Sequence, residues 1–293
     1  MAQFEPQGIK KTDIAKTSKS PSVLTTGQST VVTAPLTSPQ QSDSQPGATP
    51  GIISSPFPGN EKEIQVEAGE IHYIFSNKGG IIKHILLPRY RNDDGDVIDL
   101  INNPDNLTGA LSIKSDDPEI TSILQNAYYE PSTSSIVLDE SNPEGVLTLT
   151  LKHESGLEVF REFKFHHNDY AVEVKTRITA SPLAAKNLQY SIILGPGMGG
   201  KISSQTDYIV FSGATVFNNN ERIEHPPEEL NATAYHRGDL KWVAFQNKYF
   251  GSALVPLQGS KAGIVFKEKD QVFIGLEYES VQSAATASHL FYA

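Results

Sequence analysis

Residues 238–256 read GDLKWVAFQNKYFGSALVP and contain the chain's only tryptophan, Trp242, together with three further aromatic residues. Up to Phe245 both alternating sets of side chains are mostly apolar, which is typical of a strand covered on both faces. Gly251 breaks the run, and the apolar residues 253–255 resume it until Pro256 stops it. Because an indole has the largest side-chain volume, we expect Trp242 to be an anchor of the core.

Short strands separated by turn residues continue through most of the chain. In residues 147–151 and 170–178, apolar and polar side chains alternate, which predicts strands with one face in a core and one in water. Because there is almost no helical pattern between the strands and no internal repeat, the sequence indicates an all-β, antiparallel sandwich or barrel. The other predicted strands are residues 71–75, 81–87 (ended by Pro88), 188–194, 208–211, 262–266 and 272–278.

One helix and one tight turn have clear local signals. Asp117 is a capping residue, and Pro118 suits the first helical position. Ile120, Ile123 and Leu124 then share one side, which predicts a short helix. The run Asp93-Asp94-Gly95-Asp96 predicts a hairpin turn, because glycine adopts the positive φ that such turns require.

The first 60 residues differ in composition from the rest. They hold eight of the 18 prolines and only two aromatic residues, and most of the others are Ser, Thr, Gln or small. Such a segment buries too little apolar area to offset the entropy of ordering it. We therefore expect residues 1–60 to be a disordered Ser/Thr/Pro-rich linker and residues 61–293 to form one β-domain.

Charge and composition exclude several classes of protein. Residues 1–60 carry four lysines against three acidic residues, so 20 basic and 31 acidic residues remain for residues 61–293, a net charge of −11. A domain this acidic repels phosphate backbones, so we expect no nucleic-acid partner. Without cysteine, there are no disulfides and no thiolate metal sites. No run approaches the roughly 18 apolar residues of a membrane helix, and we expect no signal peptide either.

A glycine-rich run, Gly195-Pro196-Gly197-Met198-Gly199-Gly200-Lys201, matches the spacing of a dinucleotide-binding loop and nearly matches a phosphate loop. Both loops need a helix behind them whose backbone N–H groups face phosphate. Here Pro196 removes one donor, Ile202 replaces the hydroxyl that would bind metal, and residues 202–210 have no helical period. We interpret the run as a connection between strands.

The other candidate sites also have ordinary structural interpretations. The acidic turn around Gly95 fails as an EF-hand, because Tyr90 and Ile101 stand where carboxylates are required. His166 and His167 are adjacent, so on a strand they point to opposite faces and cannot bind one ion together. Glu277 and Glu279 share a strand face, but no cleft is predicted around them. We therefore assign no catalytic, cofactor-binding or metal residue and no cofactor, and the partner-binding residues stay unknown.

Four blocks of the sequence resemble the periplasmic domain of the YidC family of bacterial membrane protein insertases, in the same order and with similar spacing. Together they span Glu61 to Ala293. They are Trp242-Val243-Ala244 with Lys248-Tyr249-Phe250, NKGGIIK at residues 77–83, FKF at 163–165 with NDYAVEV at 168–174, and HLFYA at 289–293.

The resemblance implies a twisted antiparallel β-supersandwich, similar in fold to galactose mutarotase, with one or two short helices. It also implies a location on the periplasmic side of the bacterial inner membrane. In the family, membrane insertion belongs to a separate five-helix domain, and the periplasmic domain contacts accessory subunits of the Sec translocon. The implied role is non-catalytic docking or spacing, and the implied partners are those subunits and nascent membrane proteins.

A second hypothesis stays open, namely a carbohydrate-binding or mutarotase-type sugar epimerase domain. Such epimerases use a histidine as general acid and a glutamate as general base, and the fold alone does not decide between these functions. The histidine of the epimerases lies in an Asn-x-His type of segment. None of the eight histidines matches it: His72, His84, His153, His166, His167, His225, His236 and His289.

Overall fold

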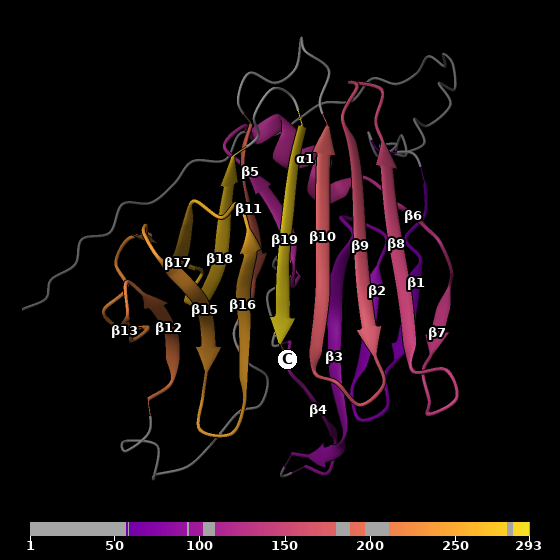
Figure 1. Ribbon diagram of the computed structural model, residues 1–293, viewed down its shortest axis with the longest axis horizontal. Helices are drawn as coiled ribbons and strands as arrows, with labels where there is room; N and C mark the ends of the chain where they lie inside the picture. The colour runs from indigo at the N-terminus through magenta and orange to yellow at the C-terminus, as the bar shows by residue number, and fades with distance from the viewer. Residues whose placement is uncertain are drawn as a thin grey trace, which may run out of the picture. The chain divides into compact units, whose positions relative to one another are not determined.

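A computed structural model of the chain describes residues 57, 59–92, 94–101, 109–179, 188–196 and 211–279, and the backbone of residues 284–292. These residues form nineteen strands and one helix, arranged in three sheets (Figure 1). The predicted all-β, antiparallel architecture is confirmed. The predicted linker lies outside the described residues except for 57, 59 and 60, so the boundary at residue 61 stays a prediction.

The largest sheet has nine strands. Its middle strand is β19, which pairs with β10 on one side and β16 on the other, both antiparallel. Figure 1 shows β19 in yellow between these two neighbours. The order across the sheet is β13 (Glu221–His225), β12 (Gly213–Asn218), β15 (Leu240–Gln246), β16 (Gly251–Gln258), β19 (Ala284–Tyr292), β10 (Ala171–Thr179), β9 (Glu158–His166), β8 (Glu144–Lys152) and β6 (Glu130–Pro131).

A five-stranded sheet covers the half of the large sheet that contains β8 and β9. Phe75 meets Phe163 edge-on with ring centroids 4.9 Å apart, and Tyr73 meets Phe165 at 5.4 Å. In this sheet β1 and β7 pair in parallel, which departs from the antiparallel rule. Its order is β4 (Val97–Asp99), β3 (Ile81–Arg91), β2 (His72–Ser76), β1 (Glu63–Glu67) and β7 (Ser135–Val137).

A second five-stranded sheet covers the other half, where β12, β15 and β16 lie. This small sheet and the large sheet are so close that a Cβ added to Gly263 would lie 2.5 Å from a methyl group of Val243. The two small sheets on one large sheet form the supersandwich. The order of this second small sheet is β14 (Ala234–His236), β17 (Ala262–Glu268), β18 (Gln271–Glu279), β11 (Gln189–Leu194) and β5 (Ser112–Ser115).

The predicted helix is α1 (Pro118–Asn126). The Asp117 carboxylate caps it by accepting hydrogen bonds from the backbone N–H groups of Glu119 and Ile120. Such a cap satisfies donors that have no partner within the first turn. Ile120, Ile123 and Leu124 are buried as expected. No helix among the described residues has the length and apolarity needed to cross a membrane.

The prediction that Trp242 anchors the core is wrong. In β15 only Val243 is fully buried, and Trp242 is half-buried, stacked on Phe217 of β12 with ring centroids 5.8 Å apart. The strand lies in the interior of its sheet, between β12 and β16. However, Val243 is on the face that meets the second small sheet, and Trp242 is on the opposite face. β18, by contrast, is covered on both faces, because its residues 272–276 are all buried.

Two prolines do not end their strands as expected. β3 continues past Pro88 to Arg91, and β16 continues past Pro256 to Gln258. The pairing register shifts at each proline, between Leu87 and Arg91 and between Pro256 and Gln258. A bulge needs no ladder hydrogen bond from the proline nitrogen, so the strand can continue. The predicted strand at 208–211 lies outside the described residues apart from Phe211.

Candidate functional site

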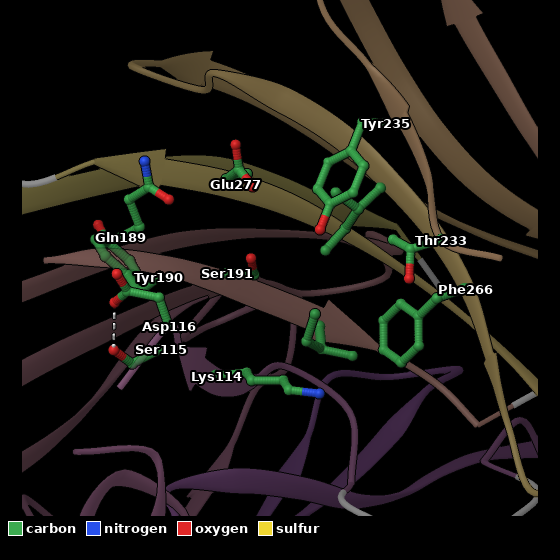
Figure 2. A pocket seen from close by; sticks show the side chains of 12 residues that line it. Lys114, Ser115, Asp116, Gln189, Tyr190, Ser191, Thr233, Tyr235, Phe266 and Glu277 are labelled. Atoms are coloured by element: carbon green, nitrogen blue, oxygen red, sulfur yellow. Dashed lines mark hydrogen bonds between the residues drawn. The ribbon is translucent and has the colours of Figure 1, made fainter. Parts of the chain in front are cut away.

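A cleft of about 250 Å³ opens on the second small sheet, on the face opposite the main core (Figure 2). The cleft forms because successive side chains along each strand point to opposite faces of the sheet. In β18 the side chains of Ile274 and Leu276 belong to the main core, whereas Phe273 and Glu277 point the other way. The cleft is lined by Lys114, Ser115, Asp116, Gln189, Tyr190, Ser191, Ile193, Thr233, Tyr235, Ile264, Phe266 and Glu277.

The floor of the cleft is apolar. Ile193 and Ile264 are buried in a cluster with Phe273, and the Phe266 ring stacks on Phe273 with centroids 5.1 Å apart. The cluster is separate from the main core, on the other side of β11, β17 and β18. An apolar floor on an otherwise ordinary sheet face gives a ligand an area from which water is displaced.

One wall of the cleft is aromatic and charged. Tyr235 comes from the edge strand β14, and about half of its surface (51%) is exposed. The Arg237 guanidinium lies 5.2 Å from the centre of the Tyr235 ring, and its Nη2 lies 3.8 Å from Oε1 of Glu277. Figure 2 shows Tyr235 and Glu277 on the same side of the opening.

The opposite wall comes from β5 and the residues after it. Lys114 places its Nζ atom 5.6 Å from the centre of the Phe266 ring. Ser115 donates a hydrogen bond from its hydroxyl to Oδ1 of Asp116 at 3.1 Å, drawn as a dashed line in Figure 2. Between the two walls, Ser191 and Gln189 of β11 add a hydroxyl and an amide.

The arrangement is suited to binding more than to proton transfer. Its exposed aromatic ring, its apolar floor and its mixed charges can hold an extended ligand through stacking, ion pairs and hydrogen bonds. No histidine lines the cleft among the described residues. The histidine and glutamate pair that an epimerase would use is therefore absent from this cleft.

The structure clarifies the sites that the sequence analysis rejected. In the glycine-rich run only Gly195 and Pro196 are described, and residues 197–201 lie outside the described residues. Asp99 accepts hydrogen bonds from the backbone N–H groups of Ile85 and Ile101, and one of its oxygens lies 2.6 Å from Nδ1 of His84. Within the described part of the chain, no three His, Asp or Glu side chains come together to hold a metal ion.

Glu277 and Glu279 have separate environments. Glu279 is paired with Lys261 at 2.8 Å, while Glu277 lies at the cleft. His166 ends β9 with its Nδ1 3.5 Å from a Glu144 oxygen, and Nδ1 of His167 lies 3.1 Å from the carbonyl oxygen of Leu138. The two histidines have different partners, as expected for adjacent residues that point to opposite faces.

The sequence analysis missed a pair of histidines. The Nε2 atoms of His225 and His236 lie 2.8 Å apart, and the rings are tilted by 66°. Burial lowers the pKa of both imidazoles below the usual 6.5, and for His236 the charge of His225 adds to this effect. The signal in the sequence was weak, because the two residues are eleven positions apart and end different strands.

The comparisons with known proteins agree with one another at the level of the family. The family model described as the YidC periplasmic domain matches residues 63–292. A membrane protein insertase YidC from Pelodictyon phaeoclathratiforme is 25% identical over 240 residues, covering 80% of this chain and 40% of that protein. The insertase YidC from Cupriavidus metallidurans is 22% identical over 232 residues, covering 77% and 40%. The chain thus spans about 40% of the length of these relatives.

Solved structures are similar in fold alone. The Slr1438 protein from Synechocystis sp. PCC 6803 has a TM-score of 0.52 at 9% identity, covering 81% of this chain and 97% of that one. A galactose mutarotase-like protein from Lactobacillus casei has a TM-score of 0.49 at 9% identity, covering 78% and 98%.

Proposed function

Because this chain belongs to the YidC periplasmic domain family, we propose that it is the non-catalytic periplasmic domain of a membrane protein insertase. The observation that carries the proposal is the family match, which extends over residues 63–292 and so includes all three sheets. The relatives are named as insertases, and they are more than twice as long as the matched region. Insertion of inner-membrane proteins is therefore proposed for the whole protein, and a supporting role for this domain.

The supporting role that we propose is docking and spacing on the periplasmic side of the inner membrane. The partners would be accessory subunits of the Sec translocon, with nascent membrane proteins as substrates of the complete insertase. Residues 1–60 would be a linker that sets the distance between the β-domain and what precedes it. The cleft on the second small sheet is the proposed contact, because it combines an exposed tyrosine with Arg237, Glu277 and an apolar floor. Exposed aromatic residues beside arginine are typical of the centres of protein interfaces.

Cross-linking tests the docking role. The 293-residue chain, carrying the photo-reactive amino acid benzoylphenylalanine in place of Tyr235, is mixed with solubilised Sec translocon that contains its accessory subunits. We expect irradiation to give a cross-link to an accessory subunit. The matched control carries the same amino acid at Val137, which is 58% exposed on β7 in the other small sheet. Equal cross-linking at both positions, or none at 235, would overturn the choice of the cleft.

Measurement of anomer exchange tests the non-catalytic assignment. Freshly dissolved α-glucose and α-galactose are followed by polarimetry with and without the chain. We expect the rate of exchange to equal that of buffer, because no histidine lines the cleft among the described residues. Turnover above buffer that is lost in the Glu277→Gln variant would overturn the assignment and establish an epimerase.

Carbohydrate binding without turnover is the second candidate. One observation favours it: the Tyr235 ring is exposed at a cleft that also offers the carboxylates of Asp116 and Glu277. Sugars stack on aromatic rings and donate hydroxyl hydrogen bonds to carboxylates. Titration calorimetry with neutral oligosaccharides tests it, with Tyr235→Ala as the matched variant. Saturable heat that this variant abolishes would favour sugar binding over protein docking.

A further inference from the structure

His225 and His236 join the edges of two different sheets. His225 is the last residue of β13, the edge strand of the nine-stranded sheet, and His236 is the last residue of β14, the edge strand of the second small sheet. Their Nε2 atoms face each other at 2.8 Å, and their ring centroids are 4.9 Å apart. The pair closes the ten-residue segment between them, residues 226–235, whose last two residues already belong to β14.

The contact fixes the protonation of the pair. A neutral imidazole has one nitrogen that donates and one that accepts, whereas a charged imidazole only donates. At 2.8 Å, one Nε2 must donate and the other must accept, so at most one of the rings is charged. Both rings are half-buried, and burial lowers the pKa of both. At neutral pH the pair therefore has a lone pair on at least one nitrogen and a single exchangeable proton between the two.

The charged side chains next to the pair already have partners. Glu224, before His225, contacts Arg222 at 2.7 Å, and Lys267 lies 3.4 Å from Asp270. Arg237, after His236, points to Glu277. Among the described residues no carboxylate completes a three-residue ligand group with the histidines. A ligand of the pair would thus meet two imidazoles and solvent.

The two nitrogens are close enough together to bind one metal ion. A metal that binds imidazole at about 2.05 Å places two ligands about 2.9 Å apart when they meet at a right angle, and about 3.3 Å apart when the site is tetrahedral. The observed 2.8 Å is a hydrogen-bond distance, and the rings turn on binding, so it shows that both nitrogens can reach one ion and does not select the ion. Right-angled sites are typical of Cu²⁺ and Ni²⁺, and Cu²⁺ binds nitrogen ligands most tightly among the first-row divalent ions.

We propose that His225 and His236 form a two-histidine binding site for a divalent transition-metal ion, Cu²⁺ before Ni²⁺, at the junction of the two sheets. On binding, the proton of the donating ring moves from Nε2 to Nδ1 by exchange with solvent, so both imidazoles stay neutral, and both rings turn so that each Nε2 lone pair faces the ion. Water completes the coordination. The bound ion cross-links β13 to β14 and so holds the large sheet and the small sheet together at this edge, a role separate from docking at the cleft.

Titration calorimetry on the metal-free 293-residue chain, with CuCl₂, NiCl₂ and ZnCl₂ in turn, tests the site. We expect one equivalent of Cu²⁺ to bind, and Ni²⁺ and Zn²⁺ to bind more weakly, in the order of nitrogen affinity. His225→Asn and His236→Asn should each weaken Cu²⁺ binding at least about tenfold, because each variant removes one of two ligands. Electron paramagnetic resonance of the Cu²⁺ complex should show coupling to two nitrogens in the parent chain and to one in each variant.

The matched control is His153→Asn. His153 is also half-buried, but its ring nitrogen is paired with the hydroxyl of Ser155 at 2.9 Å, not with a second histidine. The His153→Asn variant should bind Cu²⁺ with the same affinity as the parent chain. Circular dichroism of each variant checks that it folds, and the double variant His225→Asn with His236→Asn provides a second test if one single variant unfolds. Cu²⁺ binding that is the same in the parent and in the folded variants would mean an adventitious ion only and would overturn the site.

Discussion

The Arg161 guanidinium donates a hydrogen bond through Nη1 to the carbonyl oxygen of Gly80, and it does so from a fully buried position between the large sheet and the first small sheet. Its Nε and Nη2 atoms have no hydrogen-bond partner among the described residues. The guanidinium carbon lies 5.0 Å from the centre of the Phe163 ring. Burial lowers the pKa of Arg161 to about 10, and Tyr129 acts in the opposite direction.

A buried charge with one hydrogen bond is expected to cost stability. We predict that the free energy of unfolding of the Arg161→Met variant equals that of the parent chain or exceeds it by up to about 2 kcal/mol. Methionine removes the cost of desolvating the guanidinium and keeps most of the side-chain volume. Arg161→Ala should lose about 3 kcal/mol, because it leaves a cavity. Urea unfolding followed by circular dichroism measures both. A loss of more than about 2 kcal/mol in the Met variant would contradict the prediction.

The half-buried position of Trp242 gives a second prediction. Because part of its surface stays in water, Trp242→Ala should lower the free energy of unfolding by only about 1–2 kcal/mol. Phe163→Ala, at a fully buried ring in the main core, should lower it by about 3–5 kcal/mol. Chemical denaturation followed by far-ultraviolet circular dichroism compares the two. Equal losses would mean that Trp242 anchors the core after all.

The close approach at Gly263 predicts a steric effect. An alanine Cβ there would lie 2.5 Å from Cγ1 of Val243 and 3.0 Å from Cδ1 of Leu240, so the sheets would have to move apart. We expect Gly263→Ala to cost about 1–3 kcal/mol of stability, and Val243→Ala in the same chain to restore part of it. Gly251→Ala is the matched control, because its nearest contact is an ordinary 3.6 Å. Thermal unfolding of the parent, Gly263→Ala, Val243→Ala, the double variant and the control measures the coupling, and strictly additive losses would exclude the contact.

The two histidines predict a dependence of stability on pH. Their pKa values in the folded state are below 6.5, so below that pH the unfolded chain binds more protons than the folded chain. The contribution of the pair to stability is therefore complete above pH 6.5 and is lost as the pH falls through the lowered values. The slope is at most about 1.4 kcal/mol per pH unit for each histidine.

Urea unfolding of the metal-free chain at pH 7.5, 6.5 and 5.5 checks this dependence. The double variant His225→Asn with His236→Asn should lose less stability over this interval than the parent chain. His153→Asn should follow the parent. Parallel curves for the parent and the double variant would show that the pair does not titrate as proposed.

The strands and the helix could be predicted because their signals are local. Alternation in residues 147–151 sets the buried leucines of β8, and Asp117 with Pro118 sets the start of α1. The environment of Trp242 could not be predicted in this way. Whether the second face of a strand is covered depends on which sheet lies over it, and that sheet is built from strands far away in the sequence.

The cleft was missed for the same reason. Lys114, Gln189, Tyr235 and Glu277 come from four strands that meet only through the order β14-β17-β18-β11-β5. The sequence shows each of them as an ordinary polar or aromatic residue on a strand. The histidine pair also depends on pairing, because each residue ends an edge strand of a different sheet.

The central place of β19 has a consequence for synthesis. This strand comes last along the described chain, yet it fills the gap between β10 and β16. While a ribosome is still translating residues 284–292, both of those neighbours have an open row of backbone donors and acceptors. Such rows attract other extended chains. A nascent chain of this protein is therefore prone to aggregate until residues 284–292 have been made, and a stop codon ahead of residue 284 would make that state permanent.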